Sequence, residues 1–345
     1  MSTTDRTIVS SAPAKVILLG GKGVNWGFPA LVTAVGIRAT CTLRARGGAG
    51  YRFTFHERTE TGDLSSLAAF KAKVDALRAA KDHAGITAIA RSDFFAPTRH
   101  VLAHVAERTG ALGFEVEWRS DIPSGSGLGS GAAAAASLAA AAFRAGGLNP
   151  EPRGLAWVAW QGDVIAHGGL GTGLDTGASA LGGIVRYSLA DGPQRVDTAT
   201  RLPLVVGDTL LRASTATSNT ASRNWLDEHP MRFHLLEEMG ILVEQAQEAI
   251  TAGDLERLGH LMNLNQLIKE KLGMSVPKTE QLVEAALGAG ALGAKISGKG
   301  SGGIIVALAP PGREQEVARA IEAAGGTAIV PAVGVDGATI ESDTQ

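Results

Sequence analysis

The sequence predicts an α+β protein built from two domains. With 345 residues, the chain exceeds the usual size of a single hydrophobic core. Segments that alternate in polarity or are rich in β-branched residues, such as 30–45 and 113–122, are interspersed with segments of helical periodicity. The 45 glycines gather at three places rather than spreading evenly. We place the domain boundary near residue 191, so that the domains cover residues 1–190 and 191–345.

The first domain is expected to mix strands with amphipathic or apolar helices. Its turn-rich segment at 20–27 and its glycine-dense segment at 168–183 are expected to be loops. The strands are expected at 8–19, 30–45, 113–122 and 184–189, and the helices at 95–109, 132–143 and 153–168.

The second domain is expected to contain long helices followed by a βα element. The helical periodicity is amphipathic, which is typical of helices that cover a sheet. A third glycine cluster, 294–303, is expected to be a loop between a helix that ends near residue 290 and a strand. The strands are expected at 202–209, 304–309 and 327–333, and the other helices at 230–252, 254–272 and 314–324.

Composition excludes several classes of partner. The 32 basic and 34 acidic residues give a net charge of −2, which does not favour binding to nucleic acid or to a membrane surface. The single cysteine, Cys41, lies in an alternating strand pattern and is expected to be buried, so disulfides are excluded. No apolar run reaches the roughly 18 residues that span a bilayer. We therefore expect a cytoplasmic protein.

The segment 123–131 (PSGSGLGSG) has the character of a phosphate-binding loop. Its alternating glycines let backbone N–H groups turn inward, and the alanine-rich helix after it offers free N–H donors at its positive end. The segment lacks the Gly-Lys-Ser/Thr ending of a Walker loop and the glycine spacing of a Rossmann turn. A phosphate site of another family is predicted.

The three glycine clusters, in this order, resemble the motifs of the GHMP kinase superfamily. The first motif is 11–27 (SAPAKVILLGGKGVNWG), the second is 123–131 and the third is 295–303 (KISGKGSGG). The segments 161–183, 206–217 and 261–282 are most similar to mevalonate kinases.

This resemblance implies a fold and an activity. The fold would be an N-terminal domain like ribosomal S5 domain 2 and a C-terminal ferredoxin-like domain, with the glycine clusters meeting at one cleft. The activity would be ATP- and Mg²⁺-dependent phosphorylation of the 5-hydroxyl of mevalonate, in isoprenoid precursor synthesis. A homodimer is common in such relatives.

The resemblance also assigns catalytic and metal-binding residues. Asp175 would lie near the substrate hydroxyl as a base or an orienting charge, and Lys15 would approach both Asp175 and the transferred phosphoryl group. Asp163 stands where mevalonate kinases carry a Mg²⁺-binding glutamate, and Ser130 would complete the metal site. His167, four residues after Asp163, shares its helix face and is expected to support the loop.

The remaining site residues are expected to contact ATP or the acceptor. Lys22 replaces the histidine of the family's usual Glu-His pair, and a glycine replaces the second serine of the phosphate loop. The phosphate contacts are expected at Ser124, Gly125, Ser126, Gly127, Leu128, Gly129, Ser130, Gly131 and Lys299, and the acceptor contacts at Lys22, Thr172 and Thr215.

Two other functions remain open from the sequence. Lys22 and the paired glycines before it would suit a phosphomevalonate kinase, in which the lysine meets a substrate phosphate. The departures at Gly21 and Gly131 would also suit a relative that binds ATP and a small molecule without catalysis. The intact Lys15 and Asp175 argue against this second alternative.

Overall fold

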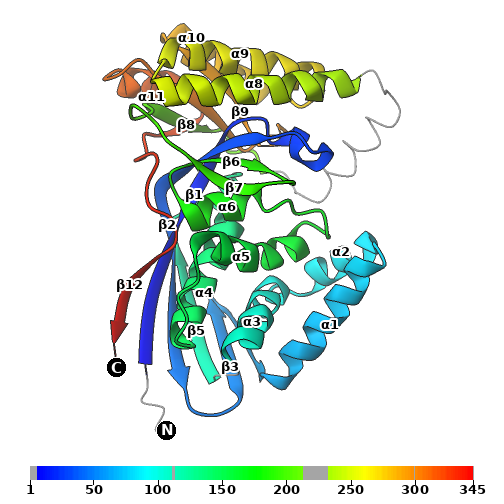
Figure 1. Cartoon of the computed structure of the whole chain (residues 1–345). Helices are drawn as coiled ribbons and strands as arrows, with labels where there is room; N and C mark the ends of the chain where they lie inside the picture. The colour runs from blue at the N-terminus through cyan, green and yellow to red at the C-terminus, as the bar shows by residue number, and fades with distance from the viewer. Residues whose placement is uncertain (1–5, 111–112, 213–231, 299, 345) are drawn as a thin grey trace.

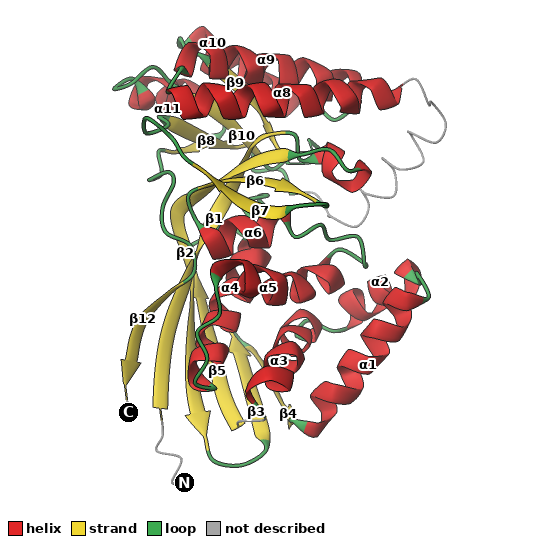
Figure 2. Cartoon of the chain, viewed as in Figure 1, coloured by secondary structure: helices red, strands yellow, loops and turns green. Residues whose placement is uncertain are grey.

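Two β-sheets, each covered by helices, organise the chain (Figures 1 and 2). A computed structural model describes residues 6–110, 113–212, 232–298 and 300–344. The first sheet has eight strands and the second has four. The predicted α+β class is therefore confirmed.

The first sheet runs in the order β12-β1-β2-β5-β3-β4, and β6 joins β7 to the edge of β2. Its neighbouring strands are antiparallel except for β3 and β5, which are parallel. Cys41 is buried in β2, as expected. The strands are β1 (Arg6–Leu19), β2 (Ala30–Arg46), β3 (Gly50–Phe55), β4 (Arg58–Asp63), β5 (Gly113–Ser120), β6 (Ile184–Ser188), β7 (Gly192–Val196) and β12 (Thr339–Thr344).

The alanine-rich helix α4 (Ser130–Ala145) packs directly on β1 and β2. Alanine has the highest helix propensity, and its small side chain allows the helix to approach the sheet closely. The hydroxyl of Ser10 on β1 donates a hydrogen bond of 2.7 Å to the carbonyl oxygen of Ser137 on α4. Figure 1 shows α1 and α2 outside α3 and α5. These helices are α1 (Ser65–Ala79), α2 (His83–Ser92), α3 (Ala96–Thr109), α5 (Pro152–Ala166) and α6 (Leu174–Leu181).

The second sheet has the order β11-β8-β10-β9, and its neighbouring strands are all antiparallel. In chain order this is the 4-1-3-2 arrangement of a ferredoxin-like domain, as the resemblance implied. Its strands are β8 (Leu204–Asp208), β9 (Gly293–Ser297), β10 (Ile304–Leu308) and β11 (Thr327–Ile329). Its helices are α8 (Phe233–Ala252), α9 (Leu255–Lys271), α10 (Pro277–Gly288) and α11 (Glu314–Ala323).

The predicted domain boundary at residue 191 does not match the sheets. Strand β7 pairs with β6 and so belongs to the first sheet, and β12 returns to pair with β1. Without β12 the outer edge of β1 would expose unpaired backbone groups. An ion pair of 2.6 Å between Arg6 and Asp343 supports this pairing. The first domain therefore contains residues from both ends of the described chain.

Several elements differ from the expectation. The glycine-dense segment 168–183 contains helix α6, and the third glycine cluster begins with the buried strand β9. Helices α1 and α2 and the hairpin of β3 and β4 were not predicted. Within the described ranges, no helix is long and apolar enough to cross a membrane.

Candidate active site

The three glycine clusters meet at one cavity of about 360 Å³ between the two sheets. The 3₁₀ helix Lys22–Trp26 contributes from the first cluster, the loop before α4 from the second, and the turn between β9 and β10 from the third. The start of α6 closes a further side. The convergence expected from the motif order is therefore present.

The loop before α4 presents most of the predicted phosphate contacts to the cavity. Among the described residues, no side chain caps the N-terminus of α4, so its first N–H groups can bind an anion. The predicted residues that line the cavity are Gly125, Ser126, Gly127, Gly129, Ser130 and Gly131.

Three predicted phosphate contacts lie elsewhere or have another role. Leu128 is buried in the hydrophobic core, and Ser124 lines a neighbouring, more apolar cavity. Ser126 lines the cavity, yet its hydroxyl donates a hydrogen bond of 2.8 Å to the carbonyl oxygen of Pro123. The side chain of Ser126 therefore braces the loop.

Lys15 and Asp175 form an ion pair at the cavity, with 3.1 Å between Nζ and Oδ1. Lys15 enters from β1 and is almost fully buried, and its Nζ also donates to the carbonyl oxygen of Gly127 at 2.9 Å. Asp175 lies in the first turn of α6, where the positive end of the helix stabilises a carboxylate. The lysine thus links the phosphate loop to the carboxylate.

Gly129 makes room for the Lys15 side chain. Its φ of +81° lies in the left-handed region, and a Cβ at this position would lie 2.9 Å from Cγ of Lys15. A glycine is therefore required by the backbone and by the neighbouring lysine together.

Two aromatic side chains fix the loop that leads into α6. The indole Nε1 of Trp160 donates a hydrogen bond of 2.7 Å to the carbonyl oxygen of Gly171. The hydroxyl of Tyr187 donates to the carbonyl oxygen of Thr172, which lines the cavity as predicted. These contacts hold Asp175 in place, and glycine spacing alone gives no signal for them.

Asp163 and His167 lie on the same face at the end of α5, as their spacing predicts. Both line the cavity, and Nδ1 of His167 is 3.1 Å from Oδ1 of Asp163. The carboxylate of Asp163 lines the same cavity as Ser130, so hard oxygen donors face the phosphate loop.

Lys22 also lines the cavity, with its Nζ 5.5 Å from the centre of the Trp26 ring. Burial lowers the pKa of Lys22 to about 8. The lysine is therefore mostly protonated at neutral pH and offers a positive charge to an anionic ligand.

Two buried lysines behind the third glycine cluster were not predicted as site elements. Lys269 of α9 donates through Nζ to the carbonyl oxygens of Ile296 at 3.0 Å and Gly298 at 2.9 Å. Burial, and then the charges of Lys15 and Lys22, lower the pKa of Lys269 to about 7. A single lysine on an amphipathic helix gives no sequence signal for such a position.

Lys295 is the second of these buried lysines. It lies in the central part of β9, is fully buried, and donates to the carbonyl oxygen of Ile296 at 2.7 Å. Burial, and then the charge of Lys269, lower its pKa well below the usual value. Two further predicted residues, Thr215 and Lys299, lie outside the described residues.

Comparison with known proteins agrees with this architecture. The model of the GHMP kinases N terminal domain matches residues 97–183, and that of the GHMP kinases C terminal domain matches residues 246–327. The chain is 33% identical to a mevalonate kinase of Pyrococcus abyssi over 345 residues, which covers 97% of this chain and 98% of the relative. A mevalonate kinase of Thermococcus gammatolerans is 34% identical over 351 residues and covers 97% of this chain and 98% of its own.

Solved structures of mevalonate kinases share the fold of this chain. A crystal structure of L. major mevalonate kinase in complex with R-mevalonate is 25% identical, with a TM-score of 0.68 over 93% of this chain and 92% of that one. The Methanococcus jannaschii mevalonate kinase, at 16% identity, shares the fold with a TM-score of 0.77 over 99% of this chain and 100% of that one. With two family models and near full-length relatives in agreement, the chain belongs to the GHMP kinase family.

Proposed function

We propose that this protein transfers the γ-phosphoryl group of ATP to the 5-hydroxyl of mevalonate, giving 5-phosphomevalonate and ADP. The observation that carries the proposal is the near full-length similarity to mevalonate kinases at 33% identity. The ion pair of Lys15 and Asp175 at the cavity supports a catalytic role for the chain. The protein acts in the cytoplasm, consistent with its buried single thiol.

In the proposed reaction, Asp175 faces the hydroxyl of the acceptor. The hydroxyl oxygen attacks the γ-phosphorus, its proton passes to the carboxylate of Asp175, and the bond to the leaving ADP oxygen breaks. Lys15 orients the carboxylate of Asp175 through their ion pair, and its amine faces the transferred phosphoryl group, whose developing negative charge it stabilises. Phosphoryl transfer needs little more than such positioning and charge stabilisation.

The phosphates of ATP bind along the loop before α4. Backbone N–H groups of Gly127, Gly129 and Ser130 and the positive end of α4 supply the contacts. The hydrogen bond from Lys15 to the carbonyl oxygen of Gly127 joins this loop to the lysine that pairs with Asp175. Binding and chemistry are therefore coupled through one side chain.

Mg²⁺ would be held by the carboxylate of Asp163, with Ser130, phosphate oxygens and water completing the shell. When bound, the ion neutralises charge on the phosphates. The fit is supported by the hard oxygen donors that line the cavity, and one or two carboxylates suffice for this ion. Gly131, which replaces the usual second serine, has no side chain to offer the ion, so water would take the place of that hydroxyl.

The test is a set of acceptors offered with Mg·ATP, followed by identification of the product by mass. We expect phosphorylation of R-mevalonate, with little turnover of 5-phosphomevalonate, homoserine or galactose. A wild-type preference for 5-phosphomevalonate in kcat/KM would make the protein a phosphomevalonate kinase. Absence of turnover with every acceptor, with ATP still bound, would favour a non-catalytic relative.

The phosphomevalonate alternative has one observation in its favour, the amine of Lys22 at the cavity. Lysine is a strong and geometrically tolerant partner for phosphate, but it also pairs with a carboxylate. In the proposed function Lys22 attracts the carboxylate of mevalonate. Comparing Lys22→Ala with the wild type on both acceptors distinguishes the two roles.

A further inference from the structure

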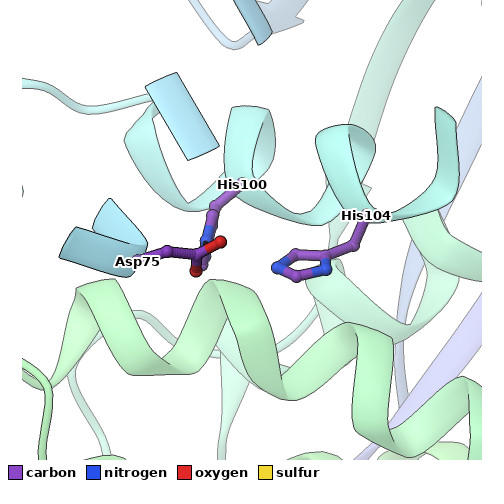
Figure 3. A group of neighbouring side chains, drawn as sticks. All are labelled: Asp75, His100 and His104. Carbon is purple, nitrogen blue, oxygen red and sulfur yellow. Dashed lines mark ion pairs between the residues drawn. The ribbon is translucent and has the colours of Figure 1, made fainter. Parts of the chain in front are cut away.

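Asp75, His100 and His104 form a cluster outside the catalytic cavity (Figure 3). Asp75 comes from α1, whereas the two histidines lie four residues apart on one face of α3. One potential ligand atom from each side chain lies within 4.8 Å of the others. None of these residues lines the catalytic cavity.

Both histidines have a buried ring nitrogen that lacks a partner. His100 is fully buried and His104 is 6% exposed. Their Nε2 atoms have no hydrogen-bond partner among the described residues. A buried polar atom without a hydrogen-bond partner destabilises the folded state, so two such nitrogens side by side indicate that a ligand is missing.

The hydrogen bonds of the cluster direct a lone pair toward its centre. Nδ1 of His100 is 2.7 Å from the carbonyl oxygen of Gln161, which can only accept, so we assign the ring proton to Nδ1. Nε2 of His100 then carries a free lone pair. Metal-binding histidines commonly donate their other ring N–H to a backbone carbonyl in this way.

Asp75 completes the set with one free oxygen. Its Oδ2 pairs with Nζ of Lys71 at 2.8 Å, and its Oδ1 lies 3.8 Å from Nε2 of His100. The side chain of Asp75 is 40% exposed, which leaves a path for an ion and for water. In Figure 3 the carboxylate and the rings of His100 and His104 lie next to one another.

We propose that Nε2 of His100, Nε2 of His104 and the carboxylate of Asp75 bind a divalent transition-metal ion of the zinc type. Two imidazoles and one carboxylate favour Zn²⁺ over Mg²⁺. Tetrahedral ligands about 2.0–2.2 Å from zinc lie about 3.3–3.6 Å from one another. The three ligand atoms lie within 4.8 Å of one another, so metal binding would draw these side chains together by up to about 1 Å. Water fills the fourth position on the exposed side.

The bound ion would join α1 to α3. Helix α1 lies at the outer side of the first domain (Figure 1), and a metal bridge to the inner helix would hold it against α3. The inference does not depend on the proposed kinase activity, because it concerns metal affinity and stability alone.

The test is a calorimetric titration of ZnCl₂ into untagged, chelator-treated protein. We expect one ion per chain and at least about tenfold weaker binding in His104→Gln and in Asp75→Asn, because each removes one of three ligands. The matched control is His234→Gln, since His234 is exposed and, among the described residues, pairs with Glu237 alone. Absence of zinc binding, or equal binding in His104→Gln and wild type, would overturn the proposal.

A second measurement separates this site from the catalytic cavity. The ring of Trp157 lies 5.3 Å from the ring of His104, so Cu²⁺ bound at the cluster is expected to quench the fluorescence of Trp157. In Trp157→Phe this part of the quenching should be absent. Asp163 and His167 are the competing ligands. If His167→Gln abolishes zinc binding while His104→Gln does not, the ion binds in the cavity and the proposal is wrong.

Discussion

The two sides of the cavity hold buried lysines in different ways. On the side of the first sheet, Lys15 pairs with the carboxylate of Asp175 and donates to one carbonyl oxygen. On the side of the second sheet, Lys269 and Lys295 donate to backbone carbonyl oxygens of β9 and of the turn after it. Burial lowers the pKa of Lys269 to about 7 and the pKa of Lys295 well below its usual value.

The difference separates two uses of a buried amine. A lysine that pairs with a carboxylate at the cavity can act on an anionic transition state. A buried lysine that donates only to backbone carbonyl oxygens loses its proton more easily, and its role is to hold the backbone segment that it contacts. We therefore assign chemistry to the first side of the cavity and loop positioning to the second.

The largest expected effect comes from breaking the charged pair. Asp175→Asn should lower kcat by about a thousandfold and leave ATP affinity near normal, because it removes charge only at the attacking hydroxyl. Lys15→Met should also depress turnover. Steady-state kinetics with mevalonate, together with calorimetric ATP binding, measure both effects.

The control for this pair is Asp191→Asn, at an exposed carboxylate that pairs with Arg186 and does not line the cavity. It should retain wild-type rates. If Asp175→Asn turns over as fast as this control, Asp175 has no catalytic role.

A smaller loss of catalytic efficiency is expected when the space that the Lys15 side chain occupies is filled. Gly129→Ala places a Cβ 2.9 Å from the lysine side chain at a backbone φ of +81°, and should lower kcat/KM by about 10- to 100-fold through misplacement of Nζ. The control is Gly288→Ala, because a Cβ there has no atom within 4 Å and this glycine of α10 does not line the cavity. Equal kinetics in the two variants would contradict the proposed spacing.

The variant Lys269→Met tests whether the buried amine on the side of the second sheet has a lowered pKa, through the pH dependence of the free energy of unfolding. The folded pKa of about 7 lies below the ordinary value of 10.5, so the unfolded chain binds more protons between these pH values. The free energy of unfolding of the wild type therefore rises with pH in this window, and this lysine contributes about 2 kcal/mol of rise from pH 7 to 9.

In Lys269→Met the increase in the free energy of unfolding that this lysine causes between pH 7 and 9 should be absent. Denaturant unfolding of both proteins at pH 7, 8 and 9 measures the difference. Lys278→Met serves as the control, since Lys278 also donates to a backbone carbonyl oxygen but is partly exposed. The same pH slope in wild type and Lys269→Met would mean that the buried amine remains protonated.

The smallest effect is expected at Lys22. With a pKa of about 8, its positive charge is present at pH 7 and is lost as the pH rises through 8. Lys22→Ala should raise KM for mevalonate about 3- to 10-fold at pH 7 with little change in kcat, because a single charge attraction is lost. In the wild type KM should rise between pH 7 and 9, and in the variant it should stay level.

The turn-forming character of each glycine cluster could be read from its local sequence, whereas the meeting of the three clusters at one cavity was implied only by the family resemblance. The loop at 123–131 owes its form to glycines with positive φ and to the alanine helix after it, and both are visible in the sequence. The pairing of Lys15 with Asp175 depended on family resemblance, because no local rule joins residues so far apart.

The remaining features depend on tertiary contacts. Strand β9 was taken for a loop because its lysine and flanking glycines conceal a strand that is buried throughout. The fixation of Gly171 by Trp160, and the environment of Lys269, require partners from other elements. Likewise, His100 and His104 show helical spacing in the sequence, but Asp75 reaches them only through the packing of α1 on α3.

The pairing of β12 with β1 has a consequence for the folding kinetics of the protein. Thr7 pairs with Thr344, so the edge of the first sheet is completed by a contact that closes almost the whole chain into a loop. Contacts of such long sequence separation form late and slow the folding reaction. During synthesis on the ribosome, one edge of β1 stays unpaired until residues 339–344 emerge. An unpaired strand edge can pair with another chain, so the protein is prone to aggregate during this interval.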